Sequence, residues 1–199
     1  KENFEKKWIK KLFYEVELIK GLFSKKPQEI SILEFGAGWG YWSQHLQKKG
    51  FNVSAFEVSD TRIKHMERNG IEVLPNINIT SKKFDFIYSE ETFEHINNPK
   101  ETLIDLSKIL KDGGYMLLRF PSNFLFKFKI RNNYQPTSDC AHPLEHINLF
   151  KKKSFNKMLK GTNLTTISLK SQFNFTPKNF LKDVKNLFFF QSILIKKDQ

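Results

Sequence analysis

The sequence predicts an α/β protein with a doubly wound, mostly parallel sheet and helices on both faces. Three observations support this fold class. Short apolar segments alternate with helical segments of about ten residues from residue 30 to residue 120, which is typical of parallel sheets. A glycine-rich turn follows the first apolar segment and leads into a helix. A final apolar segment, 187–195, supplies a last strand.

The composition fits one globular domain over 1–199. Hydrophobic residues make up 39% of the 199-residue chain, enough for one sizeable core but not comfortably for two. Cys140 is the single cysteine, so a disulfide within the chain is impossible. No apolar run reaches the ~20 residues of a spanning helix, and no signal peptide is visible. We therefore expect a cytoplasmic protein without a membrane span.

The net charge of +12 is unevenly distributed, because residues 151–199 contain 11 Lys and two Asp. Such a balance can indicate binding to nucleic acid, to an anionic membrane surface or to an anionic substrate. The lysines are scattered singly and arginine, which reads bases bidentately, is scarce. A solvated lysine-rich surface is therefore favoured over a functional basic face, and nucleic-acid binding stays possible without being favoured. The oligomeric state is not indicated.

The predicted elements follow in order along the chain. An N-terminal helix occupies the segment 1–27, because apolar residues recur at helical spacing from Phe4 to Ile19 and Pro27 ends the run. Asp60 is the expected N-cap of a later helix that ends at Arg68. The first half then contains strands at 30–35, 52–58 and 71–74, and helices at 41–49 and 60–68.

The second half begins with the same alternation. It contains a strand at 84–89, a helix at 99–110 closed by Asp112-Gly113-Gly114, and a strand at 115–120. The irregular segment 121–150 is too long for an ordinary connection, and we interpret it as a substrate-side insertion or lid. The remaining predicted elements are a helix at 154–159, a strand at 164–169, a helix at 177–185 and a strand at 187–195.

The strongest motif is the glycine turn Leu33-Glu34-Phe35-Gly36-Ala37-Gly38-Trp39-Gly40. Its glycines permit a sharp turn and a close approach to a ligand. A dinucleotide fingerprint, G-x-G-x-x-G, would place its third glycine at position 41, where the chain has Tyr41. Glu57 ends the second strand, where a carboxylate can accept hydrogen bonds from both hydroxyls of a ribose. The pattern therefore predicts a nucleoside cofactor other than NAD.

The G-x-G-x-G spacing after Glu34 resembles motif I of class I methyltransferases that use S-adenosyl-L-methionine (SAM). Residues Phe84 to Ile96, FDFIYSEETFEHI, resemble the fourth-strand motif of the UbiG-like small-molecule methyltransferases. Three further segments resemble later signatures of the same family: Leu110-Lys111-Asp112-Gly113-Gly114-Tyr115, Pro121-Ser122-Asn123 and Glu145-His146-Ile147-Asn148-Leu149-Phe150. The resemblance covers residues 30–170.

This resemblance implies a Rossmann-like sheet of seven strands whose last strand is antiparallel, and SAM as the cofactor. Glu57 with Val58 would hold the ribose, and Glu90 would lie near the sulfonium. The family's usual acidic residue and small apolar patch for adenine are missing, so Asn76 and Ile77 are the candidate adenine contacts. The methionine part would be lined by Glu34, Gly36, Ala37, Gly38, Trp39 and Gly40.

Methyl transfer to a hydroxyl requires a group that removes its proton, and histidine suits this task near neutral pH. His142, in the irregular connection, is the preferred candidate. His95 follows the fourth strand and is either a base or a structural cap of that loop, and His146 is better explained as a packing residue. Cys140, His142 and His146 lack a second cysteine for a structural zinc site, so no metal is predicted.

Three residues are candidate substrate contacts. Arg119 lies near the end of the fifth strand and would either bind an anionic substrate or form a salt bridge across the sheet edge. Phe124 belongs to an alternating apolar and basic segment that lines a cleft or packs on the core. Glu145 belongs to the later family signature.

The expected function is SAM-dependent methylation of a hydroxyl, or less readily an amine, on a small polar acceptor such as a saccharide or a phosphorylated metabolite. One alternative is an RNA or protein methyltransferase, which the positive charge favours but for which no Asn-Pro-Pro-aromatic tetrad is present. A second alternative is a SAM-binding regulatory or scaffold protein without turnover.

Overall fold

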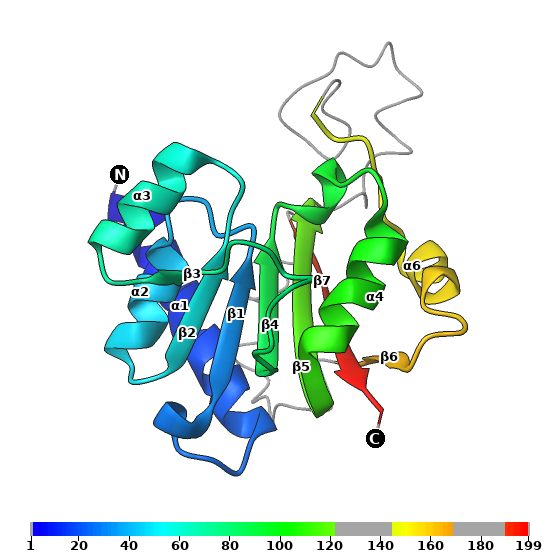
Figure 1. The fold of residues 1–199 in the computed structure, drawn as a ribbon, viewed down its shortest axis with the longest axis horizontal. Coiled ribbons are helices and arrows are strands. Elements are labelled where there is room, and N and C mark those ends of the chain that lie inside the picture. The colour runs from blue at the N-terminus through cyan, green and yellow to red at the C-terminus, as the bar shows by residue number, and fades with distance from the viewer. Residues whose placement is uncertain (1, 122–144, 169–189, 199) are drawn as a thin grey trace.

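The computed structural model describes residues 2–121, 145–168 and 190–198 (Figure 1). Within them, seven strands form one sheet in the order β3-β2-β1-β4-β5-β7-β6. From β3 to β5 neighbouring strands pair in parallel, whereas β7 runs antiparallel to both β5 and β6. The expected Rossmann-like α/β fold is therefore confirmed. The strands are β1 Ser31–Phe35, β2 Asn52–Phe56, β3 Glu72–Val73, β4 Phe84–Glu90, β5 Leu110–Pro121, β6 Leu164–Ile167 and β7 Phe190–Lys197.

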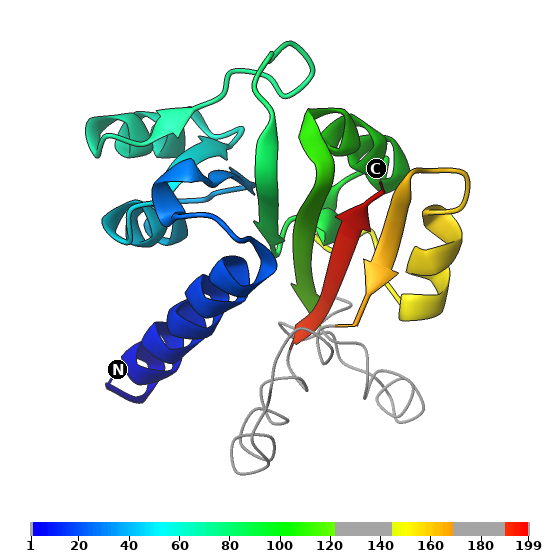
Figure 2. The same cartoon turned by 90° about the horizontal axis from the view of Figure 1, so that it is seen from below.

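Helices cover both faces of the sheet (Figure 2). One face carries α1 Glu2–Leu22, α2 Tyr41–Lys48 and α3 Asp60–Arg68, and the other carries α4 Pro99–Ile109 and α6 Lys152–Met158. Two short 3-10 helices, η1 Pro27–Glu29 and η2 Phe93–His95, lie in the connections. The parallel strands β1, β2, β4 and β5 all end at the same edge of the sheet, at the top of Figure 1.

The helix α1 packs on the sheet through a single stripe of side chains. Leu12, Val16 and Ile19 recur at helical spacing and are at most 3% exposed. Burying each of them contributes roughly 1.5–3 kcal/mol. Glu15 lies on the same stripe and is only 5% exposed, so a charged residue is buried in the middle of an apolar face.

The strand β4 lies at the centre of the sheet and is buried from Phe84 to Ser89, as a central parallel strand is expected to be. Asp85 is the polar exception at its amino end. Its carboxylate accepts hydrogen bonds from the ammonium groups of Lys25 and Lys111, both at 2.7 Å, and from the Ser31 N–H at 2.9 Å. Burial raises the pKa of Asp85, but these donors outweigh burial and lower it overall.

Several predicted element ends are wrong, since α1 ends at Leu22 instead of near residue 27 and β2 ends at Phe56 instead of at Val58. Ser59 is the N-cap of α3 and Asp60 is its first helical residue, because the extended backbone of Ser59 ends the preceding loop. The strand β5 begins at Leu110 rather than at Tyr115, and the Asp112-Gly113-Gly114 segment lies inside it at a register irregularity opposite β4. The predicted helix at 177–185 and most of the predicted insertion at 121–150 fall outside the described residues.

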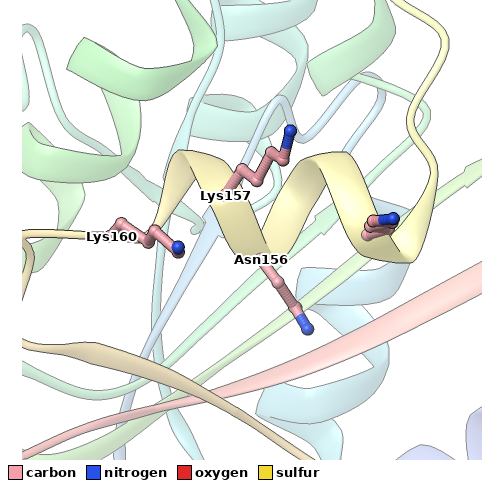
Figure 3. A pocket seen from close by; sticks show the side chains of 4 residues that line it. Asn156, Lys157 and Lys160 are labelled. Atoms are coloured by element: carbon pink, nitrogen blue, oxygen red, sulfur yellow. The ribbon is translucent and has the colours of Figure 1, made fainter.

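Lysines on α6 carry part of the basic charge. Lys153, Asn156, Lys157 and Lys160 are exposed and line a shallow hollow of about 560 Å³ (Figure 3). This helix lies beside β6, which is the edge strand at the opposite end of the sheet from β3. Over the described parts of the chain, no helix has both the length and the apolar character needed to cross a membrane.

Candidate functional site

The glycine turn joins β1 to α2 at the carboxyl edge of the sheet. The N–H groups of Gly36 and Ala37 both donate to the Phe56 carbonyl at the end of β2, at 2.9 and 3.0 Å. Gly40, with φ +72°, is the N-cap of α2 and has no side chain to cap it. The turn is therefore held by backbone contacts and lies between β2 and β4, beside the point where the strand order reverses.

Gly36 and Gly38 have different surroundings although both have positive φ, +77° and +57°. A Cβ added to Gly36 would lie 2.2 Å from the Oγ1 atom of Thr92, so this glycine is required by packing. A Cβ added to Gly38 would have no atom of the described residues within 4 Å. The backbone at Gly38 therefore borders open space in which a ligand can lie.

Glu57 lies beside that open space. One carboxylate oxygen accepts the Gly38 N–H at 2.8 Å, and the other accepts the N–H groups of Val58 and Ser59 at 2.8 and 3.0 Å. The Arg62 guanidinium lies 3.7 Å from the first oxygen. The side chain is thus fixed by the backbone, and the oxygen that faces Gly38 has lone-pair capacity left for a ligand hydroxyl.

The residues predicted to contact adenine form a less complete binding surface than those around Glu57. Trp39 is 42% exposed, and its ring lies edge-on to His65 with Arg62 above it at 5.9 Å. Asn76 is exposed, and its side-chain oxygen accepts the Asn78 N–H at 2.8 Å. Ile77 is 8% exposed and packs in the main core. The exposed Trp39 is therefore the more accessible flat surface of these residues.

Glu34 is buried at 6% exposure beneath the turn. One oxygen of its carboxyl group accepts both the Ser43 N–H at 3.0 Å and the Ser43 hydroxyl at 2.6 Å. Since Ser43 lies in the first turn of α2, Glu34 supplies the cap that Gly40 lacks. Burial raises the pKa of Glu34 to about 8, although the Ser43 hydrogen bonds lower it.

This raised pKa predicts that the protein becomes less stable as the pH rises. Folded Glu34 keeps its proton up to pH about 8, whereas the unfolded side chain releases it near 4.5. Its contribution to stability is therefore full below pH 4.5 and is lost as the pH rises to about 8, by roughly 5 kcal/mol in all. Urea unfolding of wild type and Glu34→Gln at pH 5 and pH 9 measures this loss of stability. Glu67→Gln, at an exposed glutamate, is the control. An equal loss of stability in wild type and Glu34→Gln would contradict the assignment.

Glu90, at the carboxyl end of β4, is surrounded by donors. Its carboxylate accepts a hydrogen bond from the Tyr88 hydroxyl at 2.9 Å and forms an ion pair with Lys11. The Nε atom of Arg119 lies 3.5 Å from its other oxygen. Burial raises the pKa of Glu90, but the charges of Arg119 and Lys11 outweigh burial and lower it. Glu90 is therefore held as a carboxylate.

The next residue, Glu91, has φ +49°, a left-handed conformation that is unusual for a residue other than glycine. Its N–H donates to the Arg119 carbonyl of β5 at 2.9 Å, which holds this conformation. Burial and the neighbouring Glu90 raise the pKa of Glu91. Strained backbone of this kind concentrates at functional sites.

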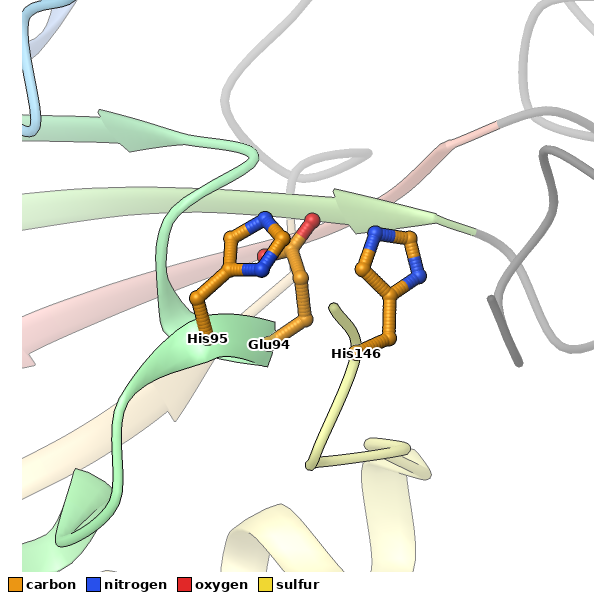
Figure 4. A group of neighbouring side chains, drawn as sticks. All are labelled: Glu94, His95 and His146. Carbon is orange, nitrogen blue, oxygen red and sulfur yellow. The ribbon is translucent and has the colours of Figure 1, made fainter. Parts of the chain in front are cut away.

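Three side chains beyond Glu91 point toward one another (Figure 4). Ligand atoms of Glu94, His95 and His146 all lie within 4.8 Å of each other. The Glu94 carboxylate is buried, and no group in the described part of the chain donates a hydrogen bond to either of its oxygens. Burial raises the pKa of Glu94 to about 7. A carboxylate with two imidazoles can hold a divalent cation, and among the residues with described positions these three form such a group.

The tautomer of His95 follows from its partner. Its Nδ1 atom lies 2.6 Å from the Glu145 carbonyl oxygen. A carbonyl only accepts, so Nδ1 carries the proton and Nε2 keeps a lone pair. The Asn148 N–H donates to the Glu94 carbonyl at 3.0 Å and fixes this later segment against η2. The His95 side chain is exposed, and its Nε2 atom is available to accept a proton.

The predicted site residues fall into several groups, one of which is His95 with His146 and Glu145. The structure brings the glycine turn, Glu57 and Val58 together, and it places Glu90 and Arg119 side by side on paired strands. His142 and Phe124 lie outside the described residues. The sequence analysis missed Lys11, Glu15 and Tyr88. Glu15 could have been identified from the sequence, because it is a charged residue on the apolar stripe of a predicted helix.

A glycine turn over the switch point of such a sheet, with an acidic residue after β2, defines a nucleoside-cofactor-binding α/β domain. Residues 7–169 match the family model described as a methyltransferase domain. The chain belongs to this methyltransferase-domain family, so the family expected from the sequence is confirmed.

Curated relatives agree with the expected UbiG-like group. A ubiquinone biosynthesis O-methyltransferase of Maricaulis maris is 27% identical over 109 residues, which are 49% of this chain and 43% of the relative. A malonyl-[acyl-carrier protein] O-methyltransferase of Ilyobacter polytropus is 31% identical over 109 residues, covering 49% of this chain and 42% of the relative. The matched segments thus span less than half the length of these relatives.

Solved structures share the fold. The plantazolicin methyltransferase BpumL in complex with SAH has a TM-score of 0.66 at 15% identity, covering 95% of this chain and 84% of that one. A SAM-dependent methyltransferase from Clostridium acetobutylicum has a TM-score of 0.60 at 15% identity, covering 85% of this chain and 84% of that one.

Proposed function

We propose that this chain is a methyltransferase that uses SAM to methylate a hydroxyl group of a small polar acceptor. The observation that carries the proposal is the open space at Gly38 beside the fixed carboxylate of Glu57. A neutral ribose fits there, since a carboxylate accepts hydroxyl hydrogens and repels phosphate. An oxygen acceptor is supported by the relatives, whose names are those of O-methyltransferases.

In this proposal the residues divide the work by position. SAM supplies the methyl group from its cationic sulfonium. Glu57 would hold the ribose, Gly38 would let the backbone approach the methionine part, and Glu90 would lie on the side of the cation. Displacement at a methyl carbon needs alignment of the acceptor more than covalent help from the protein.

We assign the removal of the proton from the acceptor hydroxyl to His95. Its Nε2 lone pair is available because Nδ1–H is held by the Glu145 carbonyl. Glu94 and His146 lie against it and keep the ring in place. His142 remains a second candidate for this role.

Replacing His95 tests the assignment. We expect His95→Gln to lower the methylation rate about 100-fold while SAM affinity stays within about twofold, because only the proton acceptor is lost. His45→Gln, a histidine on α2, is the matched control and is expected to retain the rate. A His95→Gln protein with an unchanged rate would exclude His95, and His142→Gln would then be measured.

Calorimetric titration with SAM, and separately with NAD, tests the function itself. Micromolar SAM binding without NAD binding is the expected result, followed by an acceptor screen over saccharides and phosphorylated metabolites. A folded protein that binds no SAM would overturn the proposal. Tight SAM binding without turnover of any acceptor would favour a regulatory SAM-binding protein instead.

A further inference from the structure

The carboxylate of Glu15 is buried on α1 and is shared by three other elements. It accepts hydrogen bonds from the Trp42 indole N–H of α2 at 2.9 Å, from the Tyr88 hydroxyl of β4 at 3.0 Å and from the Arg119 guanidinium of β5 at 2.5 Å. Two of these donors, Tyr88 and Arg119, also contact Glu90. Glu15 is therefore connected to Glu90, at the carboxyl end of β4, through the side chains of Tyr88 and Arg119.

We propose that Glu15 is a positioning residue of the methyl-transfer site, which keeps the Glu90 carboxylate available to the cationic sulfonium by sharing Tyr88 and Arg119 with it. This inference rests on the proposed function, because it requires SAM to bind beside Glu90. The N-terminal helix then completes the cofactor site instead of only covering the sheet.

The hydrogen-bonding capacity of the Tyr88 hydroxyl supports the inference that Glu15 and Glu90 share this donor. Its hydroxyl lies 3.0 Å from a Glu15 oxygen and 2.9 Å from a Glu90 oxygen. A hydroxyl has a single proton, so it donates to one carboxylate at a time. Removing the charge of Glu15 leaves Glu90 as the stronger acceptor, and the Tyr88 hydroxyl then donates its hydrogen bond to Glu90 alone. That contact reduces the negative charge that Glu90 offers to a ligand.

The charges in this network balance. Glu15 and Glu90 face Arg119 and Lys11, and Lys11 lies 4.0 Å from Glu15 as well as pairing with Glu90. With Glu15 neutralised, two cations surround a single carboxylate. A cationic ligand beside Glu90 is then repelled, whereas a ligand that is neutral at sulfur is not.

S-adenosylhomocysteine (SAH) provides the comparison, because it differs from SAM by the methyl group and the positive charge at sulfur. For Glu15→Gln we expect the Kd for SAM to rise roughly tenfold while the Kd for SAH changes less than about twofold. A role of Glu15 in packing alone would weaken both ligands equally. The ratio of the two Kd values, measured by calorimetry, separates these cases.

Glu17→Gln is the matched control. It removes the same charge from the same helix, but Glu17 is exposed and pairs with Lys20 at 3.1 Å, so the ratio of Kd values is expected to stay at the wild-type value. Arg119→Met removes a positive charge from the network, and the ratio is expected to shift in the opposite direction. Combining it with Glu15→Gln replaces the buried pair by neutral side chains and should restore the wild-type ratio.

The possible outcomes test the role of Glu15 separately from the proposed function. A folded Glu15→Gln protein with a wild-type ratio overturns the role of Glu15 and leaves the proposed function intact. If Glu15→Gln does not fold, Arg119→Met and the double variant are compared, and equal ratios in these two overturn the role. A wild-type protein that binds neither SAM nor SAH overturns the proposed function and this inference with it.

Discussion

Glu57→Gln is expected to lower the affinity for SAM by about 100-fold. Three of the roughly four lone-pair sites of the carboxylate are taken by backbone N–H groups. The remaining site would accept one ribose hydroxyl in a charge-assisted hydrogen bond worth roughly 1.5–3 kcal/mol. The amide that replaces it accepts through one oxygen only. Its NH₂ group would also face one of the backbone N–H groups that Glu57 now accepts from Gly38, Val58 and Ser59.

Calorimetry with SAM measures this effect, and Glu67→Gln on the exposed surface of α3 is the control. Because the three backbone N–H groups also hold the turn, the thermal unfolding of Glu57→Gln is recorded beside its affinity. A folded Glu57→Gln protein that binds SAM within threefold of wild type would rule out Glu57 as the ribose ligand.

The two central glycines are expected to respond differently to alanine. Gly36→Ala places a methyl group 2.2 Å from the Thr92 Oγ1 atom at φ +77°, and we expect a loss of about 3 kcal/mol or more in the free energy of unfolding. Gly38→Ala places its methyl group more than 4 Å from every atom in residues 2–121, 145–168 and 190–198 outside its own chain neighbours. Its expected cost is only the roughly 1–2 kcal/mol of the left-handed backbone, while its methyl group enters the space assigned to the cofactor.

Gly38→Ala should therefore remain folded and lose SAM binding by at least about tenfold, whereas Gly36→Ala should lose stability first. Urea unfolding and SAM titration of both variants measure the two effects separately. Gly70→Ala, at another positive-φ glycine with open surroundings at φ +75°, controls for the backbone cost alone. Undiminished SAM affinity in Gly38→Ala would place the cofactor elsewhere.

Local spacing in the sequence was enough to predict much of the fold and of the cofactor side. The glycine turn, the strand that precedes it and the acid at the end of β2 follow from residues close together in the chain. Periodicity placed α2 and β4 close to their observed bounds. It misplaced the start of β5, because Asp112-Gly113-Gly114 is typical of a turn and only pairing with β4 makes it part of a strand.

The sequence by itself thus determined the order of elements, the family and the position of Glu57, since each depends on neighbouring residues and their hydrogen-bonding needs. Only the tertiary structure decided which charges meet. Glu15 and Arg119 are 104 residues apart, and His95 and Glu145 are 50 apart. Such contacts depend on sheet order and register, through which a helix at the start of the chain reaches the end of β5. Spacing along the chain carries no information about that approach.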